Sequence, residues 1–127
     1  MNPLMIEHIA LQVEDPRAMA AWYIEQVGMQ VVRDAGAAVF LGDATGQVIL
    51  ELYHNETVAV PDYAAMDPLL LHVAFASADP PADASPLIQA GATQIDDIHG
   101  DNGDRIIVLR DPWGLAIQLA KRAEAMR

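Results

Sequence analysis

The first part of the chain alternates apolar and polar residues and then changes to helical spacing. Within residues 6–13 the apolar positions recur at every second residue, which is the period of a pleated strand. Asp15 is a residue type that caps helices, and Pro16 suits the first helical position. Apolar residues then follow helical spacing until Gly28, a residue type that ends helices. The pattern therefore predicts a strand over residues 6–13 and a helix from Pro16 up to Gly28.

Three short strand-forming runs follow the predicted helix. They cover residues 29–34, 37–42 and 47–54 and are separated by turn-forming sequences. Residues 55–68 contain two prolines and few periodic apolar positions, which indicates a connecting loop. The same order then starts again, with a strand over 69–76, a helix after Pro80-Pro81 that ends before Gly91, and three more strands. Each half of the chain is therefore predicted to be a βαβββ unit.

The two halves also match residue by residue. The sequence HIALQVEDP, which starts at His8, aligns with HVAFASADP, which starts at His72. Later, LGDATGQVILEL aligns with LRDPWGLAIQL after one deletion. Such internal similarity indicates duplication of a supersecondary unit. We therefore expect one α+β domain over residues 1–127, with repeats at about 4–54 and 69–122 joined by a linker at 55–68, that forms an open mixed barrel around a central cavity.

Four polar residues occupy matching strand positions on the faces turned away from the predicted helices. Because successive strand residues point to opposite faces, the apolar positions that face the helices leave a histidine, a glutamate, a second histidine and a glutamine on the other side. If the repeats curve together, these side chains converge, and two imidazoles, a carboxylate and an amide suit Zn²⁺, Fe²⁺, Ni²⁺, Co²⁺ or Mn²⁺. The predicted ligands are His8, Glu51, His72 and Gln118. Tyr53 shares the face of Glu51, so it either lines the substrate cavity or fills the barrel.

With these motifs the chain resembles the vicinal oxygen chelate superfamily, which includes glyoxalase I, methylmalonyl-CoA epimerase, extradiol dioxygenases, fosfomycin-resistance enzymes and bleomycin-resistance proteins. The resemblance rests on IEHIALQVED, VILELY, LLLHVAFA and LRDPWGLAIQL. It implies that the four predicted ligands fall on the positions from which glyoxalase I and the epimerase draw theirs. The last of these positions is usually a glutamate that also moves a proton, whereas Gln118 cannot accept one. Glu51 is the only carboxylate of the four and becomes the candidate base as well as a ligand.

Composition and charge exclude several other classes of function. The chain has no cysteine, so any metal must be held by imidazole, carboxylate, amide or water ligands. Eighteen acidic residues against seven basic ones give a formal net charge of −11, which disfavours nucleic acid and anionic membranes as partners. The pattern predicts neither a signal peptide nor an apolar run long enough to span a membrane, and we expect a cytoplasmic protein.

Three functions stay open at this point. The first is a metal-dependent lyase, isomerase or epimerase acting on a small substrate, and the second is an Fe²⁺ or Mn²⁺ ring-cleaving dioxygenase. The third is a metal-free small-molecule binding protein of the bleomycin-resistance type. We also expect a homodimer, because two short units expose strand edges.

The remaining notable residues are interpreted as structural. Trp22 and Phe75 are expected in the core, and His54 and His99 in solvent or loops. Residues 111–114 read as a turn into the last strand, and the acidic run from Asp96 to Asp104 as a solvated loop that could also act as a lid or partner contact.

Overall fold

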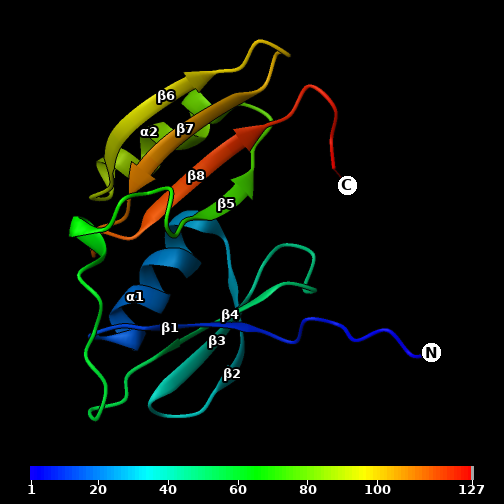
Figure 1. The fold of residues 1–127 in the computed structure, drawn as a ribbon. Coiled ribbons are helices and arrows are strands. Elements are labelled where there is room, and N and C mark those ends of the chain that lie inside the picture. Colours follow the sequence, from blue (N-terminus) through cyan, green and yellow to red (C-terminus); the bar gives the residue numbers. More distant parts are fainter. Residues whose placement is uncertain (127) are drawn as a thin grey trace. The chain divides into compact units, whose positions relative to one another are not determined.

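The computed structural model describes residues 1–126, and its chain forms two compact units. The first unit covers Met1–Pro61 and the second begins at Asp62, within the segment predicted to connect the repeats. Each unit contains one four-stranded sheet and one main helix (Figure 1). The two units are described separately below.

The first unit has the sheet order β1-β4-β3-β2. Strand β1 runs parallel to β4, and the other neighbouring strands are antiparallel. A π-helical turn, η1, continues α1 up to Gly28, whose φ of 82° ends the helix in the left-handed conformation. The elements are β1 (Ile9–Gln12), α1 (Pro16–Trp22), η1 (Tyr23–Val27), β2 (Gln30–Asp34), β3 (Ala38–Gly42) and β4 (Ile49–Tyr53).

The second unit repeats this topology in the order β5-β8-β7-β6, again with its first and last strands parallel. The predicted α+β fold with two βαβββ repeats is therefore confirmed. A short 3-10 helix, η2, lies in the connecting segment before the first strand. The elements are η2 (Tyr63–Ala65), β5 (Val73–Ala76), α2 (Pro80–Gln89), β6 (Thr93–His99), β7 (Arg105–Arg110) and β8 (Ala116–Lys121).

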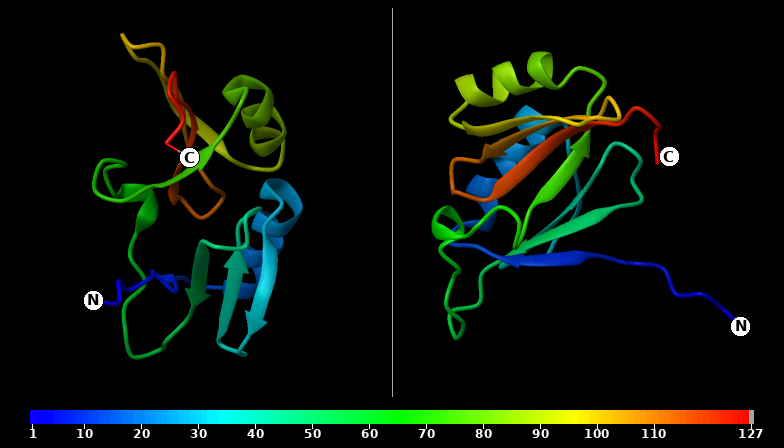
Figure 2. Two further views of the ribbon diagram at one scale, coloured as in Figure 1. Left: turned by 90° about the vertical axis from the view of Figure 1, so that its right-hand side faces the viewer. Right: turned by 45° about the horizontal axis from the view of Figure 1, so that its top comes forward.

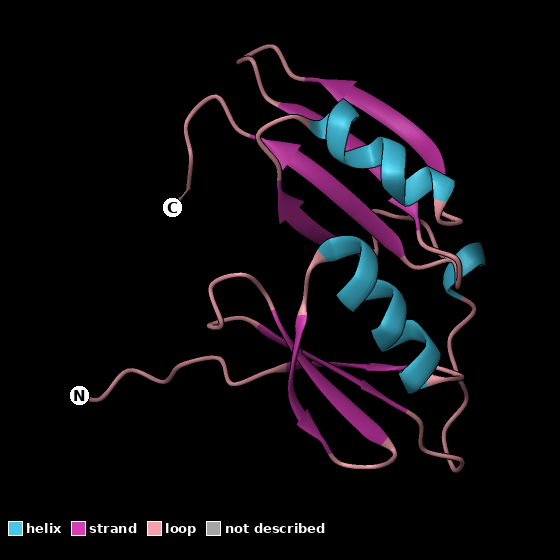
Figure 3. Ribbon diagram, turned by 180° about the vertical axis from the view of Figure 1, so that it is seen from behind, coloured by secondary structure: helices cyan, strands magenta, loops and turns pink. Residues whose placement is uncertain are grey.

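Each helix covers one face of the sheet in its own unit (Figure 3). Helix α1 contacts β3 and β4, and α2 contacts β7 and β8; the right-hand view of Figure 2 shows α2 lying along its sheet. The side chains beneath the helices are almost fully buried, including Leu41 and Leu52 in the first unit and Leu109 and Ile117 in the second. We call the other face of each sheet, turned away from the unit's own helix, its distal face.

The predicted helix start is confirmed in the first unit, and the second helix starts two residues earlier than predicted. The Asp15 carboxylate accepts a hydrogen bond from the Ala18 N–H at 3.1 Å, and that of Asp79 accepts one from the Ala82 N–H at 3.3 Å. Each aspartate thus satisfies an N–H that has no partner within the helix. Pro80 is the first residue of α2, so it belongs to the helix rather than preceding it. Among the described residues no helix is long and apolar enough to cross a membrane.

The first strand of each unit is shorter than predicted. Strand β1 begins at Ile9 instead of residue 6, and β5 begins at Val73 instead of residue 69, so both candidate histidines lie just before a strand. Residues 4–6 and 69–70 are apolar but exposed, because they have no sheet neighbour to pack against. Ile9 itself is 51% exposed, although the alternation predicted that a helix covers it. Apolar composition alone therefore overestimated the length of these two strands.

Two other predictions are partly corrected, and the one for His54 holds. Asp96 and Asp97 lie in β6, so the acidic run is a loop only after His99. His54 lies in the loop after β4, as expected, where it is half-buried and its Nδ1 is 2.7 Å from the Val13 carbonyl oxygen. Phe75 is half-buried rather than in the core.

The other side-chain predictions hold. Trp22 is buried, and the side chain of His99 is 67% exposed. Residues 111–114 form the predicted turn, which is closed by a 2.9 Å hydrogen bond from the Gly114 N–H to the Asp111 carbonyl oxygen.

Candidate functional site

On the distal face of the first unit, one carboxylate lies in a row of residues that crosses three strands. The strand register places Glu51 of β4 between Ala10 of β1 and Phe40 of β3. Leu50 and Leu52, the neighbours of Glu51 along the strand, are buried on the opposite face. The alternation in β4 therefore turns the Glu51 carboxylate away from α1, as the sequence predicts.

His8 extends this face beyond the start of β1. Its Nε2 lies 3.4 Å from Oε1 of Glu51, and its ring meets the edge of the Phe40 ring at a centroid distance of 5.4 Å. The side chain of Glu51 is 19% exposed and that of His8 is 34% exposed. The structure thus brings together the two predicted ligands that belong to the first repeat.

The other ring nitrogen of His8 also has an acidic partner. Its Nδ1 lies 2.9 Å from Oε1 of Glu7, so a protonated Nδ1 donates a hydrogen bond to this carboxylate. In the neutral ring this tautomer leaves the lone pair on Nε2, the atom that faces Glu51. An imidazole held by a carboxylate through one nitrogen presents the other nitrogen as a metal ligand.

Tyr53 lies two residues beyond Glu51 and on the same face. The register pairs it with Gln12 of β1 and Ala38 of β3, and it is half-buried. Gln12 is only 6% exposed. Its amide nitrogen donates to the carbonyl oxygens of Asn55 and Val58 at 2.7 and 2.8 Å, and its Oε1 accepts from the Asn55 N–H at 2.8 Å. Gln12 therefore holds residues 55–58 against this end of the sheet.

In the second unit His72 and Gln118 occupy the corresponding positions. Gln118 of β8 lies between Ala74 of β5 and Val108 of β7 and is half-buried. His72 is exposed just before β5, and its Nδ1 lies 2.7 Å from the Pro68 carbonyl oxygen. A carbonyl oxygen only accepts hydrogen bonds, so Nδ1 carries the proton and the Nε2 lone pair is available. No hydrogen bond joins His72 to Gln118 among the residues described.

The residues of the first unit fit a divalent metal ion. Two ligand atoms that each lie about 2.1 Å from one ion at tetrahedral angles are about 3.4 Å apart. The His8 Nε2 to Glu51 Oε1 distance is 3.4 Å. At this distance a direct hydrogen bond is weak. Within residues 1–126 no three His, Asp or Glu side chains form a ready metal cluster, so the four-residue centre stays a prediction that would combine both repeats.

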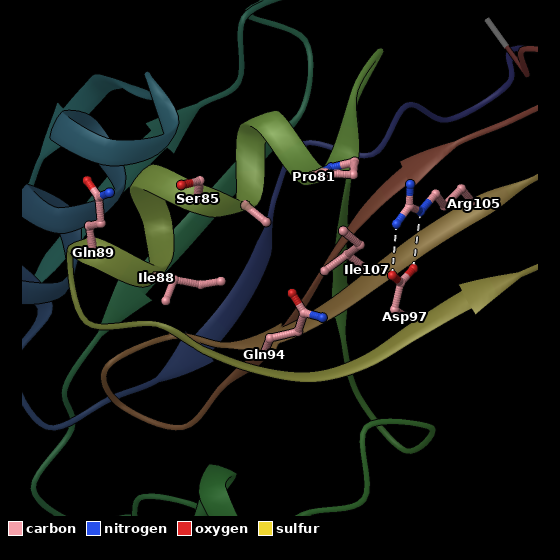
Figure 4. A pocket seen from close by; sticks show the side chains of 9 residues that line it. Pro81, Ser85, Ile88, Gln89, Gln94, Asp97, Arg105 and Ile107 are labelled. Atoms are coloured by element: carbon pink, nitrogen blue, oxygen red, sulfur yellow. Dashed lines mark hydrogen bonds and ion pairs between the residues drawn. The ribbon is translucent and has the colours of Figure 1, made fainter.

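A cavity lies on the helix side of the second unit, between α2 and strands β6 and β7 (Figure 4). It has a volume of about 400 Å³, and Ile88 and Ile107 contribute apolar walls. Arg105 and Asp97 bridge β7 and β6 at one end with a hydrogen bond of 2.8 Å. The guanidinium hydrogen bonds hold the pKa of the Asp97 carboxyl below its usual value. Because Ile107 is on the face opposite Gln118, this cavity is separate from the candidate site.

A comparison against protein-family models shows the family of the chain. Residues 8–120 match the model described as a glyoxalase-like domain. The chain belongs to this family and thereby to the vicinal oxygen chelate superfamily. A search of curated protein sequences finds no significant match.

Solved structures share the fold at low sequence identity. A glyoxalase family protein from Bacillus cereus has a TM-score of 0.79 and 17% identity, over 95% of this chain and 95% of that chain. A lactoylglutathione lyase from Agrobacterium tumefaciens has a TM-score of 0.69 and 20% identity, over 95% and 96%. An antibiotic-binding protein from a Streptomyces species has a TM-score of 0.74 and 18% identity, over 97% and 99%. These similarities show the fold and leave the activity to the site residues.

Sequence reasoning missed three residues that support the candidate site, namely Glu7, Gln12 and Phe40. Glu7 precedes His8 directly, so its position was a usable signal for a partner of the imidazole. Phe40 lies at an alternating position of β3, but its proximity to His8 depends on strand order. The contacts of Gln12 join residues more than forty positions apart, which no local pattern reports.

Proposed function

We propose that the protein is a metal-dependent lyase or isomerase of the glyoxalase type, acting on a small substrate that carries neighbouring oxygen atoms. The observation that carries the proposal is the pair His8 and Glu51, whose donor atoms have the separation of two ligands on one ion. The Nδ1 hydrogen bonds of His8 and His72 support it, because in both residues they leave the lone pair of Nε2 free to bind a metal ion. His8, Glu51, His72 and Gln118 would hold the ion, which could be Zn²⁺, Ni²⁺, Co²⁺, Mn²⁺ or Fe²⁺.

The bound ion would supply Lewis-acid chemistry, making a C–H bond next to a coordinated carbonyl more acidic. Glu51 accepts the proton from that carbon and returns it, either to the adjacent carbon or to the opposite face of the same carbon. The proton is conserved, so the reaction needs no oxidant or reductant. Oε1 of Glu51 faces His8, and we assign the proton transfer to Oε2. Tyr53 and Phe40 on the same face would exclude water from the reacting carbon.

Two other functions of this fold remain as competing proposals. A metal-free binding protein is supported by the shared fold of the Streptomyces antibiotic-binding protein. A ring-cleaving dioxygenase would use a carboxylate of the last strand, where this chain has Gln118. The glyoxalase-type proposal explains the His8 to Glu51 distance, which the metal-free proposal leaves without a role.

Metal analysis separates the enzyme from the binding protein. Protein purified without chelator and reconstituted with Zn²⁺, Ni²⁺ or Mn²⁺ should bind about one ion for each set of four ligands. The double variant His8→Ala, His72→Ala should lose this ion, whereas His99→Ala, which changes an exposed histidine, should retain it. Stoichiometry far below one ion in the unaltered protein would contradict the proposal and favour metal-free binding.

Activity measurements then test the role of Glu51. The reconstituted protein is assayed with thiol adducts of α-ketoaldehydes, acyl-CoA esters and catechols. Glu51→Gln keeps an oxygen ligand but removes the base, so it should retain much of the metal and lose turnover by at least about 100-fold. Glu56→Gln makes the same change at an exposed loop position and should leave turnover unchanged. Oxygen-dependent cleavage of a catechol would instead support the dioxygenase.

A further inference from the structure

Basic residues are scarce in this chain, and most of the described ones bind acidic side chains or backbone carbonyl oxygens. Arg17, Arg105 and Arg122 form ion pairs with aspartates, and Arg110 donates hydrogen bonds to backbone carbonyl oxygens. Within residues 1–126 two of the arginine and lysine side chains form neither a hydrogen bond nor an ion pair. They are Arg33 on β2 and Lys121 at the end of β8.

A β-bulge decides where Arg33 points. The register of β2 against β3 pairs Val31 with Leu41 and then Arg33 with Phe40, so Val32 is an extra residue in β2. Simple alternation from Val31 would place Arg33 on the helix side of the sheet. The bulge shifts the phase by one residue, and Arg33 shares the distal face with Phe40.

The neighbours of Arg33 confirm this orientation independently. Asp34, the next residue, pairs with Val39 and accepts two hydrogen bonds of 2.7 Å from Arg17 of α1, so Asp34 is on the helix side. Leu41 faces the helix, so a Cβ on the next residue, Gly42, would point to the distal face. This Cβ would lie 3.0 Å from Cγ2 of Val32, so Val32 also lies over the distal face, as the bulge requires.

The register then connects Arg33 to the candidate catalytic carboxylate. Arg33 is opposite Phe40, Phe40 is opposite Glu51, and Glu51 is opposite Ala10, so these residues form one row across the sheet. Adjacent strands lie about 4.8 Å apart, which separates the backbones of Arg33 and Glu51 by about 10 Å. Phe40 lies between them as an apolar surface on which a small substrate can rest.

We propose that Arg33 determines substrate specificity by binding an oxyanion of the substrate, such as a carboxylate or phosphate, while the opposite end of the substrate lies at His8 and Glu51. This proposal rests on the proposed function of the same face. A guanidinium binds such groups through two parallel hydrogen bonds. The equivalent bulge in β6 places Asp96 opposite Val108, so the second repeat has an anion where the first has Arg33.

The net charge of −11 allows a role of Arg33 to be distinguished from a general effect of charge on binding. An added negative charge should weaken binding of any ligand to this chain unless a local cation compensates for it. If adding one carboxylate to a ligand increases its affinity, Arg33 contacts the ligand; if the affinity falls, Arg33 does not.

Hydroxamates provide a direct test, since they bind metal ions through two neighbouring oxygens. Calorimetry on the Ni²⁺-loaded protein compares benzohydroxamate with its para-carboxylated and para-phosphonated forms. We expect one or both anionic probes to bind at least about tenfold more tightly than the parent, and the better one identifies the preferred oxyanion. Equal or weaker binding of both anionic probes overturns the role of Arg33, whereas failure of benzohydroxamate to bind contradicts the metal proposal.

Variants test whether the gain in affinity of the anionic probes comes from one side chain. Arg33→Gln should abolish the gain and leave binding of the parent hydroxamate unchanged, and Arg33→Lys should keep part of it. Lys121→Gln makes the same change in charge at an exposed residue on the helix side of the other sheet and should keep the full gain. A gain that survives in Arg33→Gln refutes the proposal.

A final measurement is independent of the metal. The Arg33 Nε–H resonance, assigned by its loss in Arg33→Gln, should shift when benzoate is added to the metal-free protein and stay in place with benzamide. Identical responses to both compounds would overturn the proposal even if the metal site fails.

Discussion

Gly114 lies directly against Ala64. A Cβ built on Gly114 would be 2.6 Å from the Ala64 Cβ and 2.7 Å from its backbone nitrogen, and the φ of Gly114 is 92°. Both the space and the backbone conformation therefore require glycine where the turn before β8 meets η2. Gly114→Ala should lower the free energy of unfolding by about 3 kcal/mol or more, from left-handed strain together with the steric clash.

Gly46 supplies a matched control for this prediction. It occupies the equivalent turn of the first repeat with a φ of 72°, but a Cβ there would meet no atom within 4 Å. Gly46→Ala should cost only about 1 kcal/mol from the positive φ. Urea unfolding of both variants measures the difference, and equal losses would contradict the close contact with Ala64.

Gln12 should stabilise the loop that follows β4. Gln12→Ala removes three hydrogen bonds to Asn55 and Val58, so we expect a loss of about 2 kcal/mol in unfolding free energy. The backbone amide hydrogen of Asn55 should also exchange faster with solvent in this variant, as measured by hydrogen–deuterium exchange. Gln30→Ala changes an exposed strand glutamine and should leave both quantities nearly unchanged. Unaltered exchange at Asn55 in Gln12→Ala would show that the loop is held by other contacts.

The Arg17 and Asp34 pair should make stability depend on acid pH. The hydrogen bonds from Arg17 hold the pKa of the Asp34 carboxyl below its usual value of 3.8. A lowered folded-state pKa stabilises the fold above the unfolded value, and this contribution is lost as the pH falls through the folded value. Asp34→Asn should therefore reduce the difference in unfolding free energy between neutral pH and about pH 3.

Asp101→Asn is the control, because it removes an exposed carboxylate from the turn between β6 and β7. It should retain the pH dependence of the unaltered protein. The same dependence in Asp34→Asn as in the unaltered protein would show that the pair with Arg17 makes no net contribution.

Glu7 should increase the metal affinity of His8 without binding the ion. Glu7→Gln removes the carboxylate that accepts from Nδ1 of His8, so it should weaken metal binding by about tenfold, the lower end expected for partners of ligand histidines. Glu14→Gln, an exposed change with the same effect on net charge, should leave the affinity unchanged. Metal titration with a competing chelator measures both, and equal affinities would remove Glu7 from the site.

Local patterns predicted the elements whose determinants are close together in the sequence. Asp15 caps the first helix and Gly28 ends it, as predicted, because caps and left-handed residues act within a few positions. Alternation in β4 turned Glu51 away from the helix as expected, since each neighbour along a strand points the opposite way.

Strand ends were less predictable. Ile6 and Leu70 have apolar side chains, yet they lie outside β1 and β5 because a strand requires a hydrogen-bonded neighbour as well as a suitable composition. The placement of Asp96 and Asp97 in β6 shows the opposite case, in which pairing with β7 overrides a polar composition.

By itself, the sequence determined the duplicated βαβββ order, the helix boundaries and the candidate ligands, because these follow from periodicity and from residue types at fixed spacing. Only the tertiary structure decided that Glu7 holds His8, that Gln12 reaches Asn55 and that Arg33 shares a face with Glu51. The first depends on rotamers, the second on packing between distant segments, and the third on a bulge that reverses the alternation. Each arises from contacts across strands or between side chains, which a linear pattern does not record.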